Sequence, residues 1–243
     1  MATTELGTPA SHASLLARRA AVKASKRGAV IALAVFAGLL VADRAAVGPF
    51  ADTTFTGTAV GLVAAAVLAV VAGVRIARAG AGDYHRARVG IRSERRVAAA
   101  LRRCNPAAVV HGAVIDGHGG DADHIVLGGV CAMVETKTGR GRIELTDDGR
   151  VRAGGRWLPK RPLQQASNQA AKVTRALGVP CTPIVCVVDA TGGPTTRNGV
   201  VVCNLKQLPQ VLASLPQQIS AEQAVAHARM LHQRSVSFEQ QAA

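Results

Sequence analysis

Acidic side chains are scarce in this chain, and three of them accompany a lysine at the ends of two predicted neighbouring strands. The 243 residues include 29 Lys and Arg but only 15 Asp and Glu. Asp121 and Asp123 begin one predicted strand, and Glu135 and Lys137 end the next. Grouped carboxylates suit Mg²⁺, which prefers oxygen ligands, so Asp121, Asp123 and Glu135 are candidate metal ligands. With a lysine to orient water or stabilise phosphate charge, the set predicts metal-assisted phosphodiester hydrolysis.

Whether these groups share one face depends on the register of the predicted hairpin. Glu135 and Lys137 are two residues apart, so they face the same side of their strand. A two-residue turn at the glycine pair would place Asp123 and Glu135 on opposite faces. A three-residue turn at 127–129 would pair Asp121 with Glu135 and put all four groups on one face. Because ungrouped carboxylates on a buried face are costly, we expect the second register or a bulge of equal effect.

The elements that must position these groups alternate between strand and helix. Apolar residues on one stripe predict a helix over 90–103. A first-turn Pro and a terminal Gly bound a helix at 162–177, and a capping box opens one at 220–240. The predicted fold class is α/β, a mixed central sheet flanked by helices. Strands are predicted at 108–115, 123–127, 130–137, 142–145, 151–153, 182–189 and 199–203, with an interrupted helical stretch at 205–215.

Four short motifs occur in order along the chain: Gly90-x-x-x-Glu94, Gly120-Asp121-Ala122-Asp123-His124, Glu135-Thr136-Lys137 and Pro162-Leu163-Gln164-Gln165. This ordered set resembles the nuclease-related domain (NERD) family, a relative of the PD-(D/E)XK nucleases. The resemblance covers roughly residues 89 to 205 and implies a restriction-endonuclease-like core. The sequence departs from the family pattern at Arg161, where an Asn is expected.

The resemblance also implies a role for each matching residue. Asp123 and Glu135 would be metal ligands, and Lys137 would orient water or stabilise charge. Glu94 would project from the first helix of the domain toward the metal, and Gln165 would project from the later helix toward the site. The implied cofactor is Mg²⁺, with Mn²⁺ as the alternative.

Other polar residues near the motifs have plainer interpretations. Gln169 lies one helical turn after Gln165 and is expected to be a helix-face residue. His124 should point away from Asp123 and be structural or exposed, because successive strand residues face opposite sides. Basic residues beyond the Glu135-Thr136-Lys137 strand form either a phosphate-contacting rim or an ordinary solvated surface; they are Arg140, Arg142, Arg156, Lys160 and Arg161.

Two uncharged apolar runs precede this domain, at 28–42 and 57–74. The second has the length of a membrane-spanning helix, and the first is short unless its helix continues toward Phe50. Basic residues flank the pair on both outer sides, and such flanks stay cytoplasmic. We therefore expect a transmembrane hairpin with both chain ends and the soluble domain in the cytoplasm, at the cell membrane. A signal peptide for the first run and two buried helices of a soluble domain are the alternatives.

The expected organisation has five parts. A basic cytoplasmic tail at 1–27, disordered over 1–17, precedes the hairpin at 28–74, and a basic connector follows at 75–88. The nuclease-related domain is expected at 89–212, with a helical tail at 213–243. The five cysteines lack CxxC spacing, so we expect buried free thiols.

The charge balance bears on the partners. A net charge of +14 favours nucleic acid or anionic lipid as a partner, while 2% aromatic residues argue against stacking a row of bases. The sequence thus predicts a membrane-anchored, Mg²⁺-dependent nuclease acting on DNA or RNA. The alternative is a non-catalytic module that binds nucleic acid or a protein at the membrane. A purely structural membrane protein would leave the carboxylates unexplained.

Overall fold

The computed structural model describes residues 3–9, 55–116, 120–146 and 148–241, together with Val22, Val30 and Ala34. The chain divides into two units, one with Met1–Ser14 and Val89–Ala243 and the other with Leu15–Arg88. Helix α2 (Phe55–Arg103) begins in the second unit and ends in the first.

The predicted membrane hairpin falls mostly outside the described part of the chain. Of the run at 28–42, only Val30 and Ala34 are described. The run at 57–74 is helical within α2, but most of its side chains are not described. Among the residues that are described, no helix combines the length and the apolar character needed to cross a membrane.

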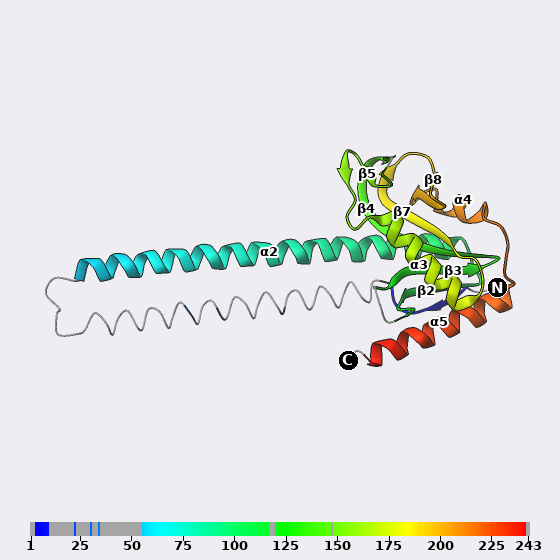
Figure 1. Ribbon diagram of the computed structural model, residues 1–243, viewed down its shortest axis with the longest axis horizontal. Coiled ribbons are helices and arrows are strands. Elements are labelled where there is room, and N and C mark those ends of the chain that lie inside the picture. Colours follow the sequence, from blue (N-terminus) through cyan, green and yellow to red (C-terminus); the bar gives the residue numbers. More distant parts are fainter. Residues whose placement is uncertain are drawn as a thin grey trace. The chain divides into compact units, whose positions relative to one another are not determined.

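One mixed sheet organises the larger unit (Figure 1). Its main path runs in the order β1-β2-β3-β4-β7-β9-β8, with β5 and β6 extending from the far end of β4. The pairs β1–β2, β4–β7 and β7–β9 are parallel, and β2–β3, β3–β4 and β8–β9 are antiparallel. The strands are β1 (Thr4–Leu6), β2 (Ala108–Ala113), β3 (Ala122–Gly128), β4 (Val130–Leu145), β5 (Val151–Ala153), β6 (Arg156–Trp157), β7 (Thr182–Thr191), β8 (Thr195–Arg197) and β9 (Val200–Asn204).

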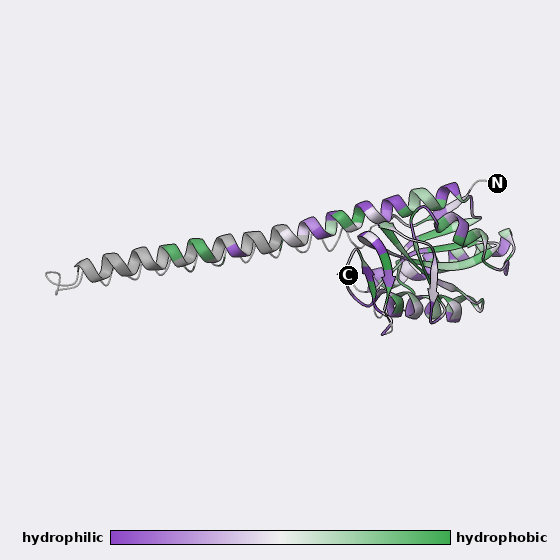
Figure 2. Ribbon diagram, turned by 90° about the horizontal axis from the view of Figure 1, so that it is seen from above, coloured by the Kyte–Doolittle hydropathy of each residue, from purple (hydrophilic) through white to green (hydrophobic). Residues whose placement is uncertain are grey.

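Helices cover both faces of this sheet, so its strands are apolar on both sides (Figure 2). On one face α3 (Pro162–Leu177) and α5 (Ala221–Gln241) pack on residues such as Ile125 and Met133. On the other face the end of α2 and α4 (Leu208–Ala213) pack on residues such as Val126 and Val134. The predicted fold class, a mixed central sheet flanked by helices, is confirmed.

Both ends of the chain contribute to this unit. Thr4–Leu6, expected in a disordered tail, forms a strand parallel to β2, and Glu5 accepts a hydrogen bond from Arg102 at 2.6 Å. Residues 213–243, expected as a tail, include α5, whose buried Ala224, Ala228 and Leu231 belong to the core. The predicted capping box of α5 is present, with reciprocal hydrogen bonds between Ser220 and Gln223.

The β3–β4 hairpin has neither of the registers considered from the sequence. Gly128 pairs with Val130, and His124 pairs with Val134. The tight turn uses the positive φ of Gly129, 75°. Position 128 also requires glycine, because a Cβ there would lie 2.3 Å from the nitrogen of Ala107. The observed register differs from the preferred one by an even number of positions. Asp123, Glu135 and Lys137 therefore still lie on the same face of the sheet, as predicted.

The pairing of β2 with β3 brings two buried histidines together on the opposite face of the sheet from Asp123. His111 of β2 pairs with His124 of β3, and their Nδ1 atoms lie 2.8 Å apart. One ring must donate its Nδ1–H and the other must be neutral to accept it. Burial lowers the pKa of His111 to about 4, and burial also lowers the pKa of His124 well below its ordinary range. The expectation that His124 is structural agrees with this arrangement.

We expect this pair to make the fold acid-sensitive. The unfolded chain binds protons on these histidines near pH 6.5, whereas the folded chain does not until about pH 4 for His111. The free energy of unfolding therefore decreases as the pH falls from 6.5 to about 4, by about 3 kcal/mol for His111 alone. Urea unfolding at pH 7 and pH 4 should show a smaller loss in a variant carrying both His111→Leu and His124→Leu. An equal loss of stability in the wild type and the variant would show that these two histidines do not cause the acid sensitivity.

Candidate active site

Strand β4 carries the two central groups of the site. Glu135 is only 1% exposed, and its Oε1 accepts a hydrogen bond from the ammonium of Lys137. The same ammonium donates to Oε1 of Gln165 on α3 at 3.1 Å. Two of the three N–H bonds of Lys137 thus fix its position. Within the described part of the chain, Oε2 of Glu135 is buried and has no hydrogen-bond partner.

Asp123 lies on the neighbouring strand β3, where the register places it opposite Glu135. Its Oδ2 accepts a hydrogen bond from the backbone N–H of Thr136 at 2.6 Å, which ties the carboxylate to β4. Burial raises the pKa of Asp123 well above its ordinary value, and the negative charges of Glu135 and Glu94 raise it further. The site therefore concentrates negative charge in a desolvated place.

The pKa of Glu135 is also raised, chiefly by burial. The charge and hydrogen bond of Lys137 oppose this rise, while the charge of Asp121 adds to it. Lys160, from the loop before α3, also lowers the pKa of Glu135, so its positive charge reaches the site. Asp121 and Asp123 thus both influence the site electrostatically.

Helix α2 brings Glu94 to this group. Val97 and Leu101 are fully buried against the sheet and fix the end of the helix. One turn earlier, the buried Ser93 shares a hydrogen bond of 2.7 Å with Thr138, just beyond Lys137 on β4. Glu94 follows Ser93 directly and lies close enough to Asp123 to raise its pKa.

Helix α3 positions the two glutamines. Its buried face includes Leu163, Ala166 and Ala170, which pack on the sheet. Gln165 binds Lys137, as described above. Gln169 is not the surface residue expected from the sequence, because it is 3% exposed and donates through Nε2 to the carbonyl of Gly120 at 3.1 Å. It thereby holds the segment that leads to Asp121. In the sequence, only its spacing of one helical turn from Gln165 indicates that the two glutamines lie on the same side of α3.

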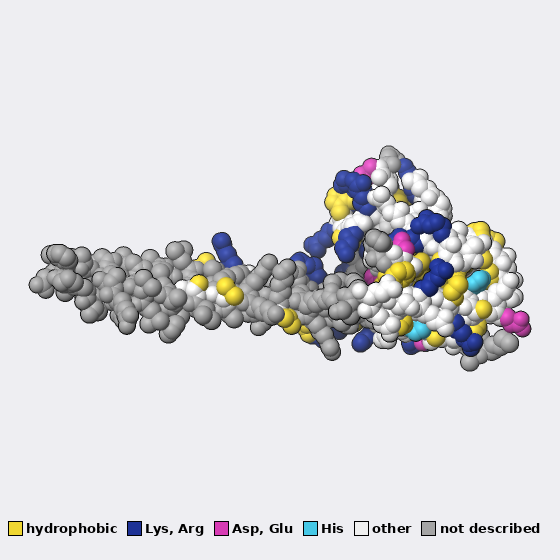
Figure 3. Space-filling model, turned by 60° about the horizontal axis from the view of Figure 1, so that its bottom comes forward, with side chains coloured by type: hydrophobic (Ala, Val, Ile, Leu, Met, Phe, Trp, Pro, Cys, Tyr) yellow, Lys and Arg dark blue, Asp and Glu magenta, His cyan; other side chains and the backbone are white. Residues whose placement is uncertain are grey.

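The loop before α3 ends in two cationic residues with left-handed backbones. Lys160 has a φ of 65° and Arg161 a φ of 44°. Asn adopts this conformation more readily than Arg, which gives a physical reason for the Asn expected at this position in the resemblance. The side chains of Lys160 and Arg161 are exposed, as are those of Arg140, Arg142 and Arg156. Figure 3 shows several patches of Lys and Arg on the upper lobe of the molecule.

The residues present fit a divalent cation with oxygen ligands. Oε2 of Glu135 is a buried acceptor without a donor in the described residues, and the neighbouring Asp123 raises the local negative charge. Mg²⁺ is commonly held by one or two carboxylates and keeps several waters. The described residues contain no cluster of three or more His, Cys, Asp or Glu side chains arranged to hold a metal.

All five cysteines are free thiols, and four of them are buried. They are Cys131, Cys181, Cys186 and Cys203, with Cys104 half-buried. Cys131 and Cys181 are within hydrogen-bonding reach of each other, as are Cys186 and Cys203. The expectation of buried free thiols holds for these four.

Comparison with known proteins gives one match. Residues 89–188 match the family model of NERD, the nuclease-related domain. The matched range contains all six candidate residues proposed from the sequence: Glu94, Asp121, Asp123, Glu135, Lys137 and Gln165. Searches among curated proteins and among solved structures found no significant match.

Proposed function

From the nuclease-related domain at residues 89–188, we propose that the chain hydrolyses phosphodiester bonds of nucleic acid with Mg²⁺ or Mn²⁺. The observation that carries the proposal is the contact of Lys137 with both the buried Glu135 and Gln165, beside a second, half-buried carboxylate, Asp123. A module that only binds a polyanion gains nothing from buried carboxylates near its ligand, because like charges repel.

Asp123 and Glu135 would hold the ion, and Asp121 would add negative charge nearby. Bound there, the ion would polarise a phosphate oxygen and lower the pKa of a water molecule. Binding also relieves the repulsion that raises the pKa of both carboxyls.

Lys137 would contribute the fixed positive charge. Since two of its N–H bonds go to Glu135 and Gln165, the third can donate to a phosphate oxygen or to the attacking water. A preorganised donor of this kind stabilises the charge that develops on the phosphate in the transition state. Glu94 would add a further acceptor near Asp123. Gln165 would hold the ammonium of Lys137 in position through their hydrogen bond.

The test is a cleavage assay of the full-length chain on plasmid DNA and on RNA, with Mg²⁺, Mn²⁺ or EDTA. We expect metal-dependent cleavage, which Glu135→Gln should reduce at least about a hundredfold because it removes a ligand charge. Glu222→Gln, at an exposed site on α5, is the matched control and should cleave like the wild type. Binding without any cleavage under all metal conditions would leave only the alternative of a non-catalytic membrane-tethered module.

We also propose that the chain is anchored in the cell membrane by residues 28–74, with both ends and the domain in the cytoplasm. The support is in the sequence: two apolar runs without charge, flanked on both outer sides by Lys and Arg. The check is carbonate washing of isolated membranes, which should leave the full-length chain in the pellet. Release into the wash would contradict the anchor.

A further inference from the structure

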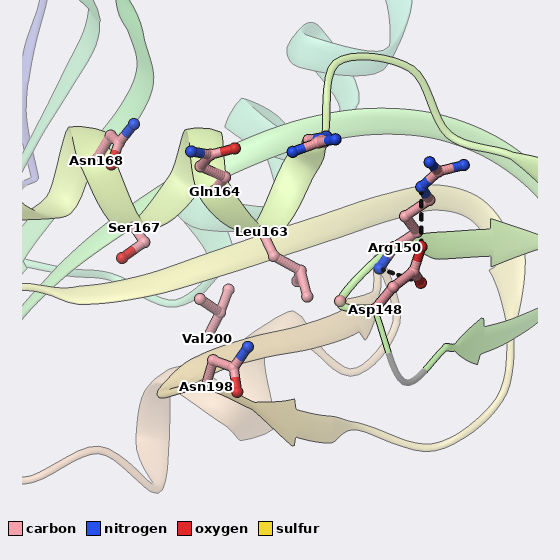
Figure 4. A pocket seen from close by; sticks show the side chains of 10 residues that line it. Asp148, Arg150, Leu163, Gln164, Ser167, Asn168, Asn198 and Val200 are labelled. Atoms are coloured by element: carbon pink, nitrogen blue, oxygen red, sulfur yellow. Dashed lines mark hydrogen bonds and ion pairs between the residues drawn. The ribbon is translucent and has the colours of Figure 1, made fainter.

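A pocket of about 340 Å³ lies beside the first turns of α3 (Figure 4). Gln165 and Gln169 of this helix face Lys137 and Gly120, whereas Gln164, Ser167 and Asn168 line the pocket. The pocket is therefore on a different side of α3 from the candidate active site. Its volume is at the lower end of the range for small-molecule sites.

The residues that line the pocket are mostly polar or cationic, with a small apolar surface. Leu163 and Val200 supply the apolar surface, and amide and hydroxyl groups come from Asn198 and from the three helix residues. Arg150 and Arg161 add positive charge. The acidic Asp148 is paired with Arg150, Nε to Oδ2, at 3.0 Å. Such a mixture of donors, acceptors and cations suits a planar polar ring that carries a phosphate.

Trp157, the one tryptophan in the chain, does not line the pocket itself but contacts Arg150, which does. Its side chain is 44% exposed. The guanidinium carbon of Arg152 lies 3.8 Å from the ring centroid, and that of Arg150 lies 5.2 Å away. Arg150 thus belongs both to the pocket and to this stack. Because Arg152 already covers part of the ring, a base would stack on the exposed part of the indole or on an arginine plane, two surfaces on which unpaired bases stack in other proteins.

Two consecutive residues connect the pocket with the candidate active site. The charge of Lys160 reaches Glu135, and Arg161 lines the pocket. A polyanion that passes over the start of α3 would therefore meet cations on both sides of it.

We propose that the pocket and the Trp157 stack form a subsite for one unpaired nucleotide that flanks the scissile phosphate. The inference rests on the proposed nuclease function and deepens it, because it makes single-stranded nucleic acid the preferred substrate. In a duplex the bases are already stacked on their neighbours, so their faces are not available to Trp157. A low aromatic content argues against a row of stacked bases, but a single ring is enough for one.

The test uses the full-length chain in EDTA, so that no cleavage occurs. The probes are a short single-stranded oligonucleotide, as DNA and as RNA, and a blunt duplex of the same length. Stacking should quench the fluorescence of Trp157, which can be followed without a label because no other tryptophan is present. Fluorescence anisotropy of labelled probes gives the affinities.

We expect Trp157→Ala to weaken single-strand binding about tenfold and to leave duplex binding almost unchanged. Arg161→Asn removes one of the two pocket cations while suiting the left-handed backbone, and it should also weaken single-strand binding. Arg229→Asn, at an exposed position on α5, is the control. Equal single-strand affinity in wild type and both variants, without quenching, would overturn the subsite and leave the nuclease proposal standing. Failure to bind any of the probes would also overturn the subsite, and the cleavage assay with metal tests the nuclease proposal separately.

Discussion

Replacing Lys137 with methionine is expected to lower the rate of phosphodiester cleavage about a thousandfold while nucleic-acid binding is retained. Removing one preorganised donor to a developing charge typically costs a factor of this size. Binding should survive because the exposed cations of the surrounding loops, such as Arg140 and Lys160, remain in place. Lys206→Met, at an exposed position, is the control for the loss of a charge.

The same variant should change the pH dependence of the residual activity. Lys137 opposes the rise in the pKa of Glu135, so without it this pKa moves further upward. Glu135 must be ionised to hold a cation, and the acid side of the pH–rate profile should therefore move to higher pH. Single-turnover rates across pH 5 to 9 give the measurement. An unchanged profile with full activity would show that Lys137 is not in the catalytic machinery.

Replacing Asp123 with asparagine should abolish cleavage and raise the thermal stability of the metal-free protein. The pKa of Asp123 is raised in the folded state, so ionising it at pH 7 costs folding free energy. This cost is fully present at a pH above the pKa that Asp123 has in the folded state. It disappears at a pH below the ordinary pKa of 3.8. Asn removes the charge, while its side-chain oxygen can still accept the hydrogen bond from Thr136.

Melting temperatures in EDTA provide the check for this variant. At pH 7 the variant should melt higher, by about 3 °C for each kcal/mol gained, and the gain should shrink toward pH 4. Added Mg²⁺ should stabilise the wild type but not the variant, because a ligand that binds only the folded state shifts unfolding. A variant that melts lower than the wild type at pH 7 would contradict the buried-charge argument.

Much of the site could be predicted because strand geometry is simple. Glu135 and Lys137 must share a face at a spacing of two, and any even shift of the hairpin keeps Asp123 with them. The actual register could not be predicted, because several turn lengths are compatible with the Gly128-Gly129 pair and the structure uses a tighter turn than either that was considered. The sheet flanked by helices followed from the alternation of the elements.

Other features depend on contacts between distant segments. A polar residue on a helix looks the same in sequence whether it meets water or a buried carbonyl, so the hydrogen bond of Gln169 to Gly120 could not be predicted. The strand at Thr4–Leu6 is too short to give a periodic signal. Its place is set by its hydrogen bonds with β2 and by the contact of Glu5 with Arg102.

That short strand makes the larger unit a discontinuous domain, with Leu15–Arg88 inserted between its first strand and the rest. Truncation at Val89 would therefore not release an intact domain. It would turn β2, with its buried Val109 and Val110, into an open sheet edge. Unprotected apolar edges pair readily with other chains. Aggregation of such a fragment would reflect the missing strand, and a soluble version would need residues 3–9 joined to residue 89 by a linker.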